Sequence, residues 1–200
     1  MKAGDRFSFG AYEQDNNSNN GKEQIVWRVL KVESDRALVI SDQILDRQKY
    51  HTKSFSVTWE TSSIREWLND KFLQSAFTAD ERQQILTVTV PAQDHPAPQT
   101  DNLARLRGND TRDQIFLLNA QEAEALFGSD EDRQAYPTQY TASHGIDSRS
   151  VKKPASWFLR QPHPRFGTAT ATVNQNGKLD VANVDYEQIG IRPAMWIRIQ

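Results

Sequence analysis

The sequence of 200 residues contains no cysteine. Disulfides, thiolate zinc sites and a cysteine nucleophile are therefore excluded. The chain also lacks an excess of charge of either sign, because 24 basic and 26 acidic side chains leave a net charge of -2. Without a basic field it offers no electrostatic footprint for nucleic acid or for an acidic membrane surface. We expect neither as a partner.

Long apolar runs are missing as well. No stretch approaches the roughly 18 apolar residues of a membrane span, and residues 1–10 lack the apolar region of a signal peptide. These absences predict a soluble chain whose location is cytoplasmic or unknown, since they do not exclude export. What the sequence does have is aromatic side chains, with five Trp, nine Phe and five Tyr. Length and aromatic content together predict a single domain, residues 1–200, with an aromatic-rich core.

Strand patterns occupy both ends of the chain. Residues 25–32 and 36–45 are β-branched runs separated by the polar turn 33–35, which predicts a hairpin. Near the C-terminus, two alternating runs flank the Asn-Gly turn at residues 174–177, which predicts a second hairpin. In the last strand, Trp196 shares a face with arginines, which indicates partial exposure or stacking under a guanidinium.

Helical patterns fall in the middle. Ile64, Trp67, Leu68 and Phe72 share one helix face, which predicts a buried helix capped by Ser63. Capping signals at Thr78 and Asn119 begin two further short helices. Residues 91–112 and 136–155 show no sustained period and predict long irregular connections.

Six short motifs occur in order along the chain: WRVL, TWETSSIREWLNDKF, FLLN, WFLR, NGKL and GIRPAMW. In this they resemble a bacterial family of domains of unknown function. The chain departs from that family's pattern after WFLR, where Gln161, Pro162 and His163 replace Ser-Pro-Gly, and at Ile191, which replaces Val.

The late WFLR strand, the Asn-Gly hairpin and the closing strand are also similar to the C-terminal half of C-type-lectin-like domains. That group includes formylglycine-generating enzymes, whose thiol chemistry this chain cannot perform. The resemblance implies an α+β, C-type-lectin-like fold that is loop-rich, with small mixed or antiparallel sheets and about three short helices.

Recognisable catalytic and metal-binding signatures are absent from the sequence. His51, His95, His144 and His163 are scattered, and no nucleophile elbow or phosphate-binding loop occurs. We therefore expect no cofactor. Calcium is the open alternative, because oxygen ligands crowd one hairpin, although turn-forming residues explain them equally well: Asn174, Asn176, Asp180, Asn183 and Asp185.

The two tryptophan- and arginine-bearing strands are interpreted chiefly as a scaffold that holds two recognition loops, residues 161–167 and 183–188. Asn and Tyr are the residue types that recognition loops favour. The candidate ligand-binding residues come from these loops and from the strand that leads into the first of them: Trp157, Arg160, His163, Arg165, Asn183, Asp185 and Tyr186.

The sequence thus favours a non-catalytic recognition module for a glycan or a protein ligand, in a bacterial or phage protein. One alternative is a hydrolase-like enzyme that uses His144 or His163 with loop carboxylates. Its mark would be a carboxylate or histidine with a perturbed pKa in a cleft. A structural or assembly role is the other alternative.

Overall fold

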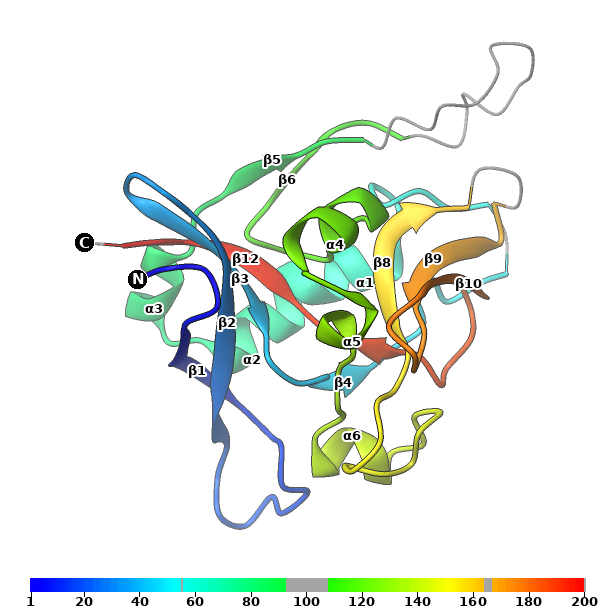
Figure 1. Ribbon diagram of the computed structural model, residues 1–200, viewed down its shortest axis with the longest axis horizontal. Coiled ribbons are helices and arrows are strands. Elements are labelled where there is room, and N and C mark those ends of the chain that lie inside the picture. The colour runs from blue at the N-terminus through cyan, green and yellow to red at the C-terminus, as the bar shows by residue number, and fades with distance from the viewer. Residues whose placement is uncertain (55, 93–107, 164–166, 200) are drawn as a thin grey trace.

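The computed structural model describes residues 1–54, 56–92, 108–163 and 167–199. Within these residues two five-stranded sheets and a two-stranded ribbon combine with short helices (Figure 1). The fold is therefore α+β, as predicted. Arg165 and His95 lie outside the described residues.

The first sheet is antiparallel throughout and contains the N-terminal hairpin. Its hairpin turn falls where the sequence predicts it, with Glu33 opposite Arg36. The C-terminal strand then pairs with the second strand of this hairpin, so that distant parts of the chain share one sheet. In spatial order the strands are β1 (Arg6–Tyr12), β2 (Glu23–Glu33), β3 (Arg36–Ser41), β12 (Ala194–Arg198) and β7 (Ile115–Phe116).

The second sheet is mixed, because one pair of strands, β11 and β8, is parallel. It contains the predicted Asn-Gly hairpin, with Leu179 opposite Val173. In spatial order its strands are β10 (Leu179–Asn183), β9 (Ala169–Val173), β8 (Trp157–Pro162), β11 (Gly190–Ile191) and β4 (Asp46–Arg47). The separate ribbon consists of β5 (Val88–Val90) and β6 (Thr111–Asp113).

The longest helical segment is continuous through α1 (Ser63–Trp67), the π-helical turn η1 (Leu68–Phe72) and α2 (Leu73–Ala76). Ser62, rather than the predicted Ser63, caps it by accepting from the N–H of Arg65. The capping boxes predicted at Thr78 and Asn119 are present. They begin the helices α3 (Ala79–Gln84) and α4 (Ala120–Leu126).

Two further helices show that the expected number of about three was too low for the described residues. They are α5 (Asp130–Arg133) and α6 (Gln139–Ser143), the second of which lies inside a stretch predicted to be irregular. Each has a side-chain cap, Ser129 for α5 and Thr138 for α6. Helices of four or five residues are too short to show a hydrophobic period, which is why the sequence pattern missed them.

The buried residues of both sheets belong to one hydrophobic cluster. Trp27 and Trp157 are fully buried in it, and each indole N–H donates to a backbone carbonyl, that of Phe9 at 2.7 Å and that of Arg133 at 3.2 Å. A satisfied donor lets a tryptophan bury its whole surface without a desolvation penalty. The prediction of an aromatic core is confirmed for these two residues.

Two arginines are part of the same interior. Arg160 is 1% exposed and donates through both terminal nitrogens to Glu122 and through one of them to the carbonyl of Leu117. Arg192 is 2% exposed, and its guanidinium lies 5.2 Å from the ring centroid of Trp157. Buried guanidinium groups that bond to backbone carbonyls tie loops to a sheet. Both side chains are therefore structural, which agrees with the interpretation of their strands as a scaffold but not with the choice of Arg160 as a ligand-binding residue.

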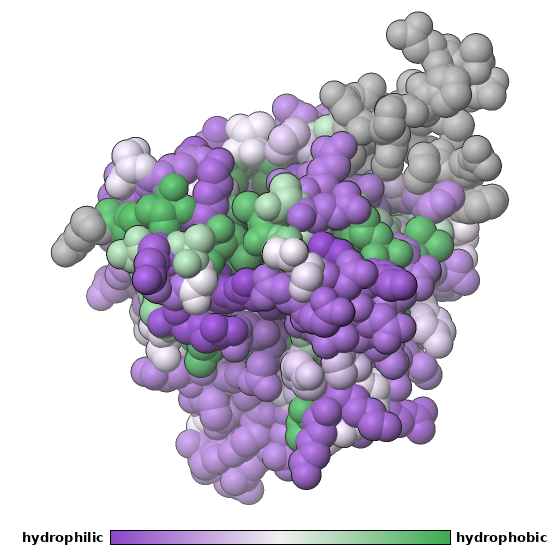
Figure 2. Space-filling view, in the orientation of Figure 1, coloured by the Kyte–Doolittle hydropathy of each residue, from purple (hydrophilic) through white to green (hydrophobic). Residues whose placement is uncertain are grey.

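On the face shown in Figure 2, hydrophobic residues form a band at the level of β12 and α4. A mainly apolar groove of about 450 Å³ lies between β5 and α4 and is lined in part by Leu38, Phe116 and Trp196. Trp196 is half-buried under the guanidinium of Arg36, 4.4 Å from the ring centroid, as expected for a stacked tryptophan. Among the described helices, none combines the length and apolar character needed to cross a membrane.

Candidate functional site

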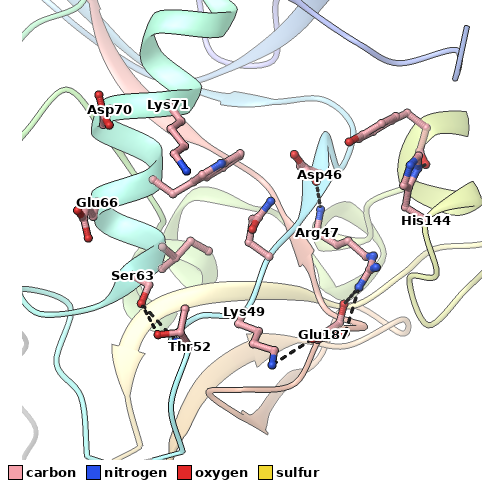
Figure 3. A pocket seen from close by; sticks show the side chains of 14 residues that line it. Asp46, Arg47, Lys49, Thr52, Ser63, Glu66, Asp70, Lys71, His144 and Glu187 are labelled. Carbon is pink, nitrogen blue, oxygen red and sulfur yellow. Dashed lines mark hydrogen bonds and ion pairs between the residues drawn. The ribbon is translucent and has the colours of Figure 1, made fainter. Parts of the chain in front are cut away.

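A cleft of about 700 Å³ with a mostly polar lining is the candidate site, and it is referred to below as the cleft. One wall is the helical segment α1–η1, which carries Ser63, Trp67 and Lys71 (Figure 3). The opposite wall consists of β4 and the two residues after it, together with Tyr140 and His144 at α6. Glu187 closes one end. In Figure 3 the Lys71 side chain points into the cleft, whereas those of Glu66 and Asp70 point away from it.

Asp46 is the buried carboxyl group of the cleft, with 5% of its surface exposed. It accepts a hydrogen bond of 2.5 Å from the Tyr12 hydroxyl and one of 2.6 Å from the N–H of Arg47. Burial raises the pKa of Asp46, and these two donors together with His144 and Arg47 only partly oppose that effect. Burial and the neighbouring Asp46 also raise the pKa of Tyr12. The pair is therefore a strong hydrogen-bonding unit at the base of the cleft.

Aromatic rings complete the cleft. The Tyr140 ring lies 4.2 Å from the imidazole of His144 and 6.4 Å from the Tyr12 ring. Trp67, which was predicted to be a core residue, packs against the core but is only half-buried and also lines the cleft. Its ring packs on Phe72 at 5.4 Å. On the helix surface Trp67 is at the margin of the stripe of Ile64, Leu68 and Phe72, which explains its partial exposure.

Several polar groups in the cleft have no partner within the described residues. They are the amide of Gln48, the indole N–H of Trp67 and the ammonium group of Lys71. Gln48 and Trp67 are half-buried and Lys71 is exposed, and none of their polar atoms is among the fully buried ones, so all three groups are open to solvent and to a ligand. Accessible donors and acceptors gathered beside aromatic rings in one hollow are the kind of lining that ligand sites have.

The charges at the end of the cleft are paired. Lys49 Nζ lies 3.1 Å from Glu187 Oε1, and Arg47 donates to the backbone carbonyl of Glu187 at 3.1 Å. The Lys49 hydrogen bond, more than any other contact, holds the pKa of Glu187 below its usual value. Since these cations already have an anionic partner, Lys71 is the lysine or arginine available to a ligand among the described residues that line the cleft.

His51 and Ser63 meet at the edge of the cleft. The N–H of Ser63 donates to His51 Nδ1 at 3.2 Å, and the Ser63 hydroxyl lies 3.0 Å from the same nitrogen. Burial and then Lys53 lower the pKa of His51. The N–H of Thr52 donates to the Ser63 hydroxyl at 3.3 Å. These bonds fasten the loop after residue 50 to the first turn of α1.

The predicted recognition residues Asn183 and Tyr186 line a second hollow, of about 670 Å³, referred to below as the sheet hollow. It lies against β9 and β10, and both of these side chains are exposed. Asp185, in the same loop, is half-buried and does not line it. The other lining residues are Asp147, Ser156, Thr168, Ala169, Thr172, Asn174, Asp180, Val181, Ala182 and Ile189.

The other predicted ligand-binding residues that the structure describes do not line the sheet hollow with Asn183 and Tyr186. Trp157 and Arg160 are 0% and 1% exposed and lie in the core, although Arg160 also borders the apolar groove between β5 and α4. His163 is half-buried beside the sheet hollow strands, where its N–H donates to the carbonyl of Ala169 at 2.8 Å. The predicted set is thus divided between interior and surface, because β8 is an inner strand with residues 157–160 all buried, whereas Asn183 and Tyr186 lie at and after the end of the edge strand β10.

Oxygen ligands for a metal gather at one place in the described residues. Carboxylate oxygens of Glu13, Asp15 and Glu23 lie within 4.8 Å of one another. Glu23 accepts from the N–H groups of Gln14 and Asp15, which accounts for its position without an ion. On the β9–β10 hairpin, where calcium was the open alternative, Asn174 accepts from the N–H of Asn176 and braces the turn. Calcium binding there stays an open alternative to the expectation of no cofactor.

Among the cleft residues that the sequence analysis missed are Asp46 and Tyr140, and it also missed Tyr12, which bonds to Asp46. One signal was available for Asp46, a charged residue that follows directly on a long apolar run. Another was available for Tyr140, because Pro137 followed by Thr138 is a typical helix start. Nothing local indicates that Tyr12 and Asp46 meet, since 34 positions separate them.

Comparison with known proteins identifies the family to which the chain belongs. Searches of curated proteins and of solved structures returned no match. Residues 34–199 match the family described as Domain of unknown function (DUF6273). This match confirms the prediction of such a family and includes the strand β4 and the helices that line the cleft. Because it covers most of the chain, the protein belongs to this family.

Proposed function

We propose that the protein is a non-catalytic binding module and that its ligand is a neutral or weakly anionic saccharide held in the cleft. The observation that carries the proposal is the set of unpaired polar groups beside half-exposed aromatic rings, with Trp67 as the central residue. Ligand sites combine apolar or aromatic surface with a few fixed polar groups. A sugar ring offers the complementary surface, an apolar face edged by hydroxyl groups.

The hydrogen-bonding partners in the cleft suit hydroxyl groups. The Asp46 carboxyl accepts, the Trp67 indole donates, and the Gln48 amide does both. Tyr12 and the Arg47 N–H hold the Asp46 carboxyl in place, so little conformational freedom is lost when a ligand binds. Lys71 adds a cation for a saccharide that carries an acidic group.

A C-type-lectin-like identity is part of this proposal. It is supported by two small sheets, short helices and long irregular connections, which are the features that the resemblance implies. Fold analogy carries no ligand with it, so the argument for a saccharide rests on the cleft itself.

The test is a thermal-shift screen of the chain against mono- and oligosaccharides, followed by calorimetry on each hit. A ligand at about 100 times its Kd should raise stability by about 2.7 kcal/mol. Trp67→Ala should abolish the shift, and Trp67→Phe should retain part of it. Trp196→Ala, a half-buried tryptophan outside the cleft, is the matched control. An unchanged shift in Trp67→Ala would refute the proposal.

Hydrolysis is a second candidate function, favoured by the contact of 3.0 Å between the Ser63 hydroxyl and His51 Nδ1. A lowered pKa keeps this imidazole neutral, the form that a general base requires. If the pair is catalytic, Ser63→Ala should abolish release of nitrophenol from nitrophenyl esters, and Thr61→Ala should not. Equal rates in the two variants would dismiss this candidate.

A further inference from the structure

One loop contributes a lining residue to the cleft and the next residue along the chain to the sheet hollow. Glu187 closes the end of the cleft, and Tyr186 lines the sheet hollow. Their Cα atoms are about 3.8 Å apart, the distance across a trans peptide bond. The loop that the sequence analysis selected for recognition is thus the boundary between two hollows of similar volume, about 700 and 670 Å³.

This boundary is held in position. Arg47 donates to the backbone carbonyl of Glu187, and Lys49 pairs with its carboxylate. On the other side, the N–H of Asp147 donates to the carbonyl of Gln188 at 3.0 Å, and the Tyr186 hydroxyl donates to the Gln188 side chain at 3.2 Å. Bonds from both hollows therefore fix the segment between them.

The sheet hollow differs from the cleft in its chemistry. Its described lining contains hydroxyl and amide groups, from residues such as Thr172, Asn174 and Asn183, and no Lys, Arg or His. The charged residues of the lining, Asp147 and Asp180, are both acidic. A chain of anionic units would be repelled there, and a neutral hydroxyl-rich chain would find donors and acceptors. Tyr186, 46% exposed, supplies the aromatic surface.

We infer that the two hollows are successive subsites for one linear, neutral oligosaccharide that crosses the Tyr186–Glu187 segment. This inference rests on the proposed function, because the cleft is taken as the first subsite. A ligand long enough to occupy both subsites gains the second set of contacts without a second association step. Affinity must therefore rise with chain length, and Tyr186 must matter only for the longer chains.

The experiment is calorimetry with linear α-1,4-glucose, β-1,4-glucose and β-1,4-N-acetylglucosamine oligomers of two to six units. In the series that binds, the hexamer should bind at least about tenfold more tightly than the dimer. Tyr186→Ala should reduce hexamer affinity to that of the dimer and leave dimer affinity unchanged. Trp67→Ala should weaken both. Tyr136→Ala removes a tyrosine that is 43% exposed and lies outside both linings, and it should change neither.

Two other results have distinct meanings. Equal affinity for dimer and hexamer, with binding still lost in Trp67→Ala, would overturn the extended site and leave the proposed function standing. If no oligomer of the three series binds, both the extended site and the proposed function would be overturned. Because Tyr186 is exposed, its removal should leave the thermal unfolding midpoint unchanged, which separates loss of binding from loss of fold.

Discussion

The ion pair between Arg160 and Glu122 provides a quantitative test of the buried scaffold. Glu122→Gln removes the charge and leaves an uncompensated guanidinium in the interior. Gln also preserves the capping box with Asn119, so the helix cap is not perturbed. Removing one member of a buried pair costs about 3 to 5 kcal/mol. The Glu122 side chain is 32% exposed, so water screens part of this effect and we expect about 2 to 3 kcal/mol.

The assay is a double-mutant cycle with Arg160→Met, read by urea unfolding. Met keeps the apolar stem and removes the cation, so Glu122→Gln should cost close to nothing in that background. For a protein of this size the single variant should lower the unfolding midpoint by roughly 4 to 12 °C. A coupling energy below about 0.5 kcal/mol, the value of an exposed pair, would refute the reasoning.

Two further predictions concern Asp46 and Gly177. Burial raises the pKa of Asp46, so the protonated carboxyl contributes to the stability of the folded protein. This contribution is fully present below the pKa of the carboxyl in the unfolded chain, and it is lost as pH rises through its pKa in the folded protein. The stability of Asp46→Asn relative to the parent protein should therefore increase from about pH 4 to pH 7 in urea titrations. A constant difference, as expected for the exposed control Asp80→Asn, would contradict this. Gly177 has φ +78, and a Cβ there would lie 1.7 Å from the Asp130 carbonyl oxygen. Gly177→Ala should cost about 2 to 5 kcal/mol in thermal unfolding, and Gly145→Ala, with φ +94 and open space, about 1 to 2. Equal costs would show that the contact with α5 relaxes freely.

The sequence predicts the elements whose signals are local. Both hairpins and the capping boxes at Thr78 and Asn119 are confirmed, because turn residues and caps act within a few positions. The scaffold role of Arg160 and Arg192 could also be predicted, since arginines in apolar strands need internal partners. The C-type-lectin-like identity stays a proposal.

The cleft could not be predicted in the same way. Its central carboxyl, Asp46, comes from a two-residue strand, and its partner Tyr12 comes from the other sheet. Tyr140 and His144 lie at a five-residue helix with no readable period. Periodicity places Trp67 on the apolar face of the helix. Whether the edge of that face is covered or exposed to solvent depends on how the neighbouring elements pack, which periodicity does not show. Sites formed by such long-range contacts have no local pattern.

Nuclear magnetic resonance of the five tryptophan indole N–H groups during saccharide titration would test the central claim most directly. The indole N–H groups of Trp27, Trp59 and Trp157 are bonded inside the protein, so their signals should stay in place. The Trp67 signal, identified by its loss in Trp67→Phe, should move in proportion to the bound fraction. Saccharide binding that leaves the Trp67 signal unmoved would contradict the assignment of the cleft.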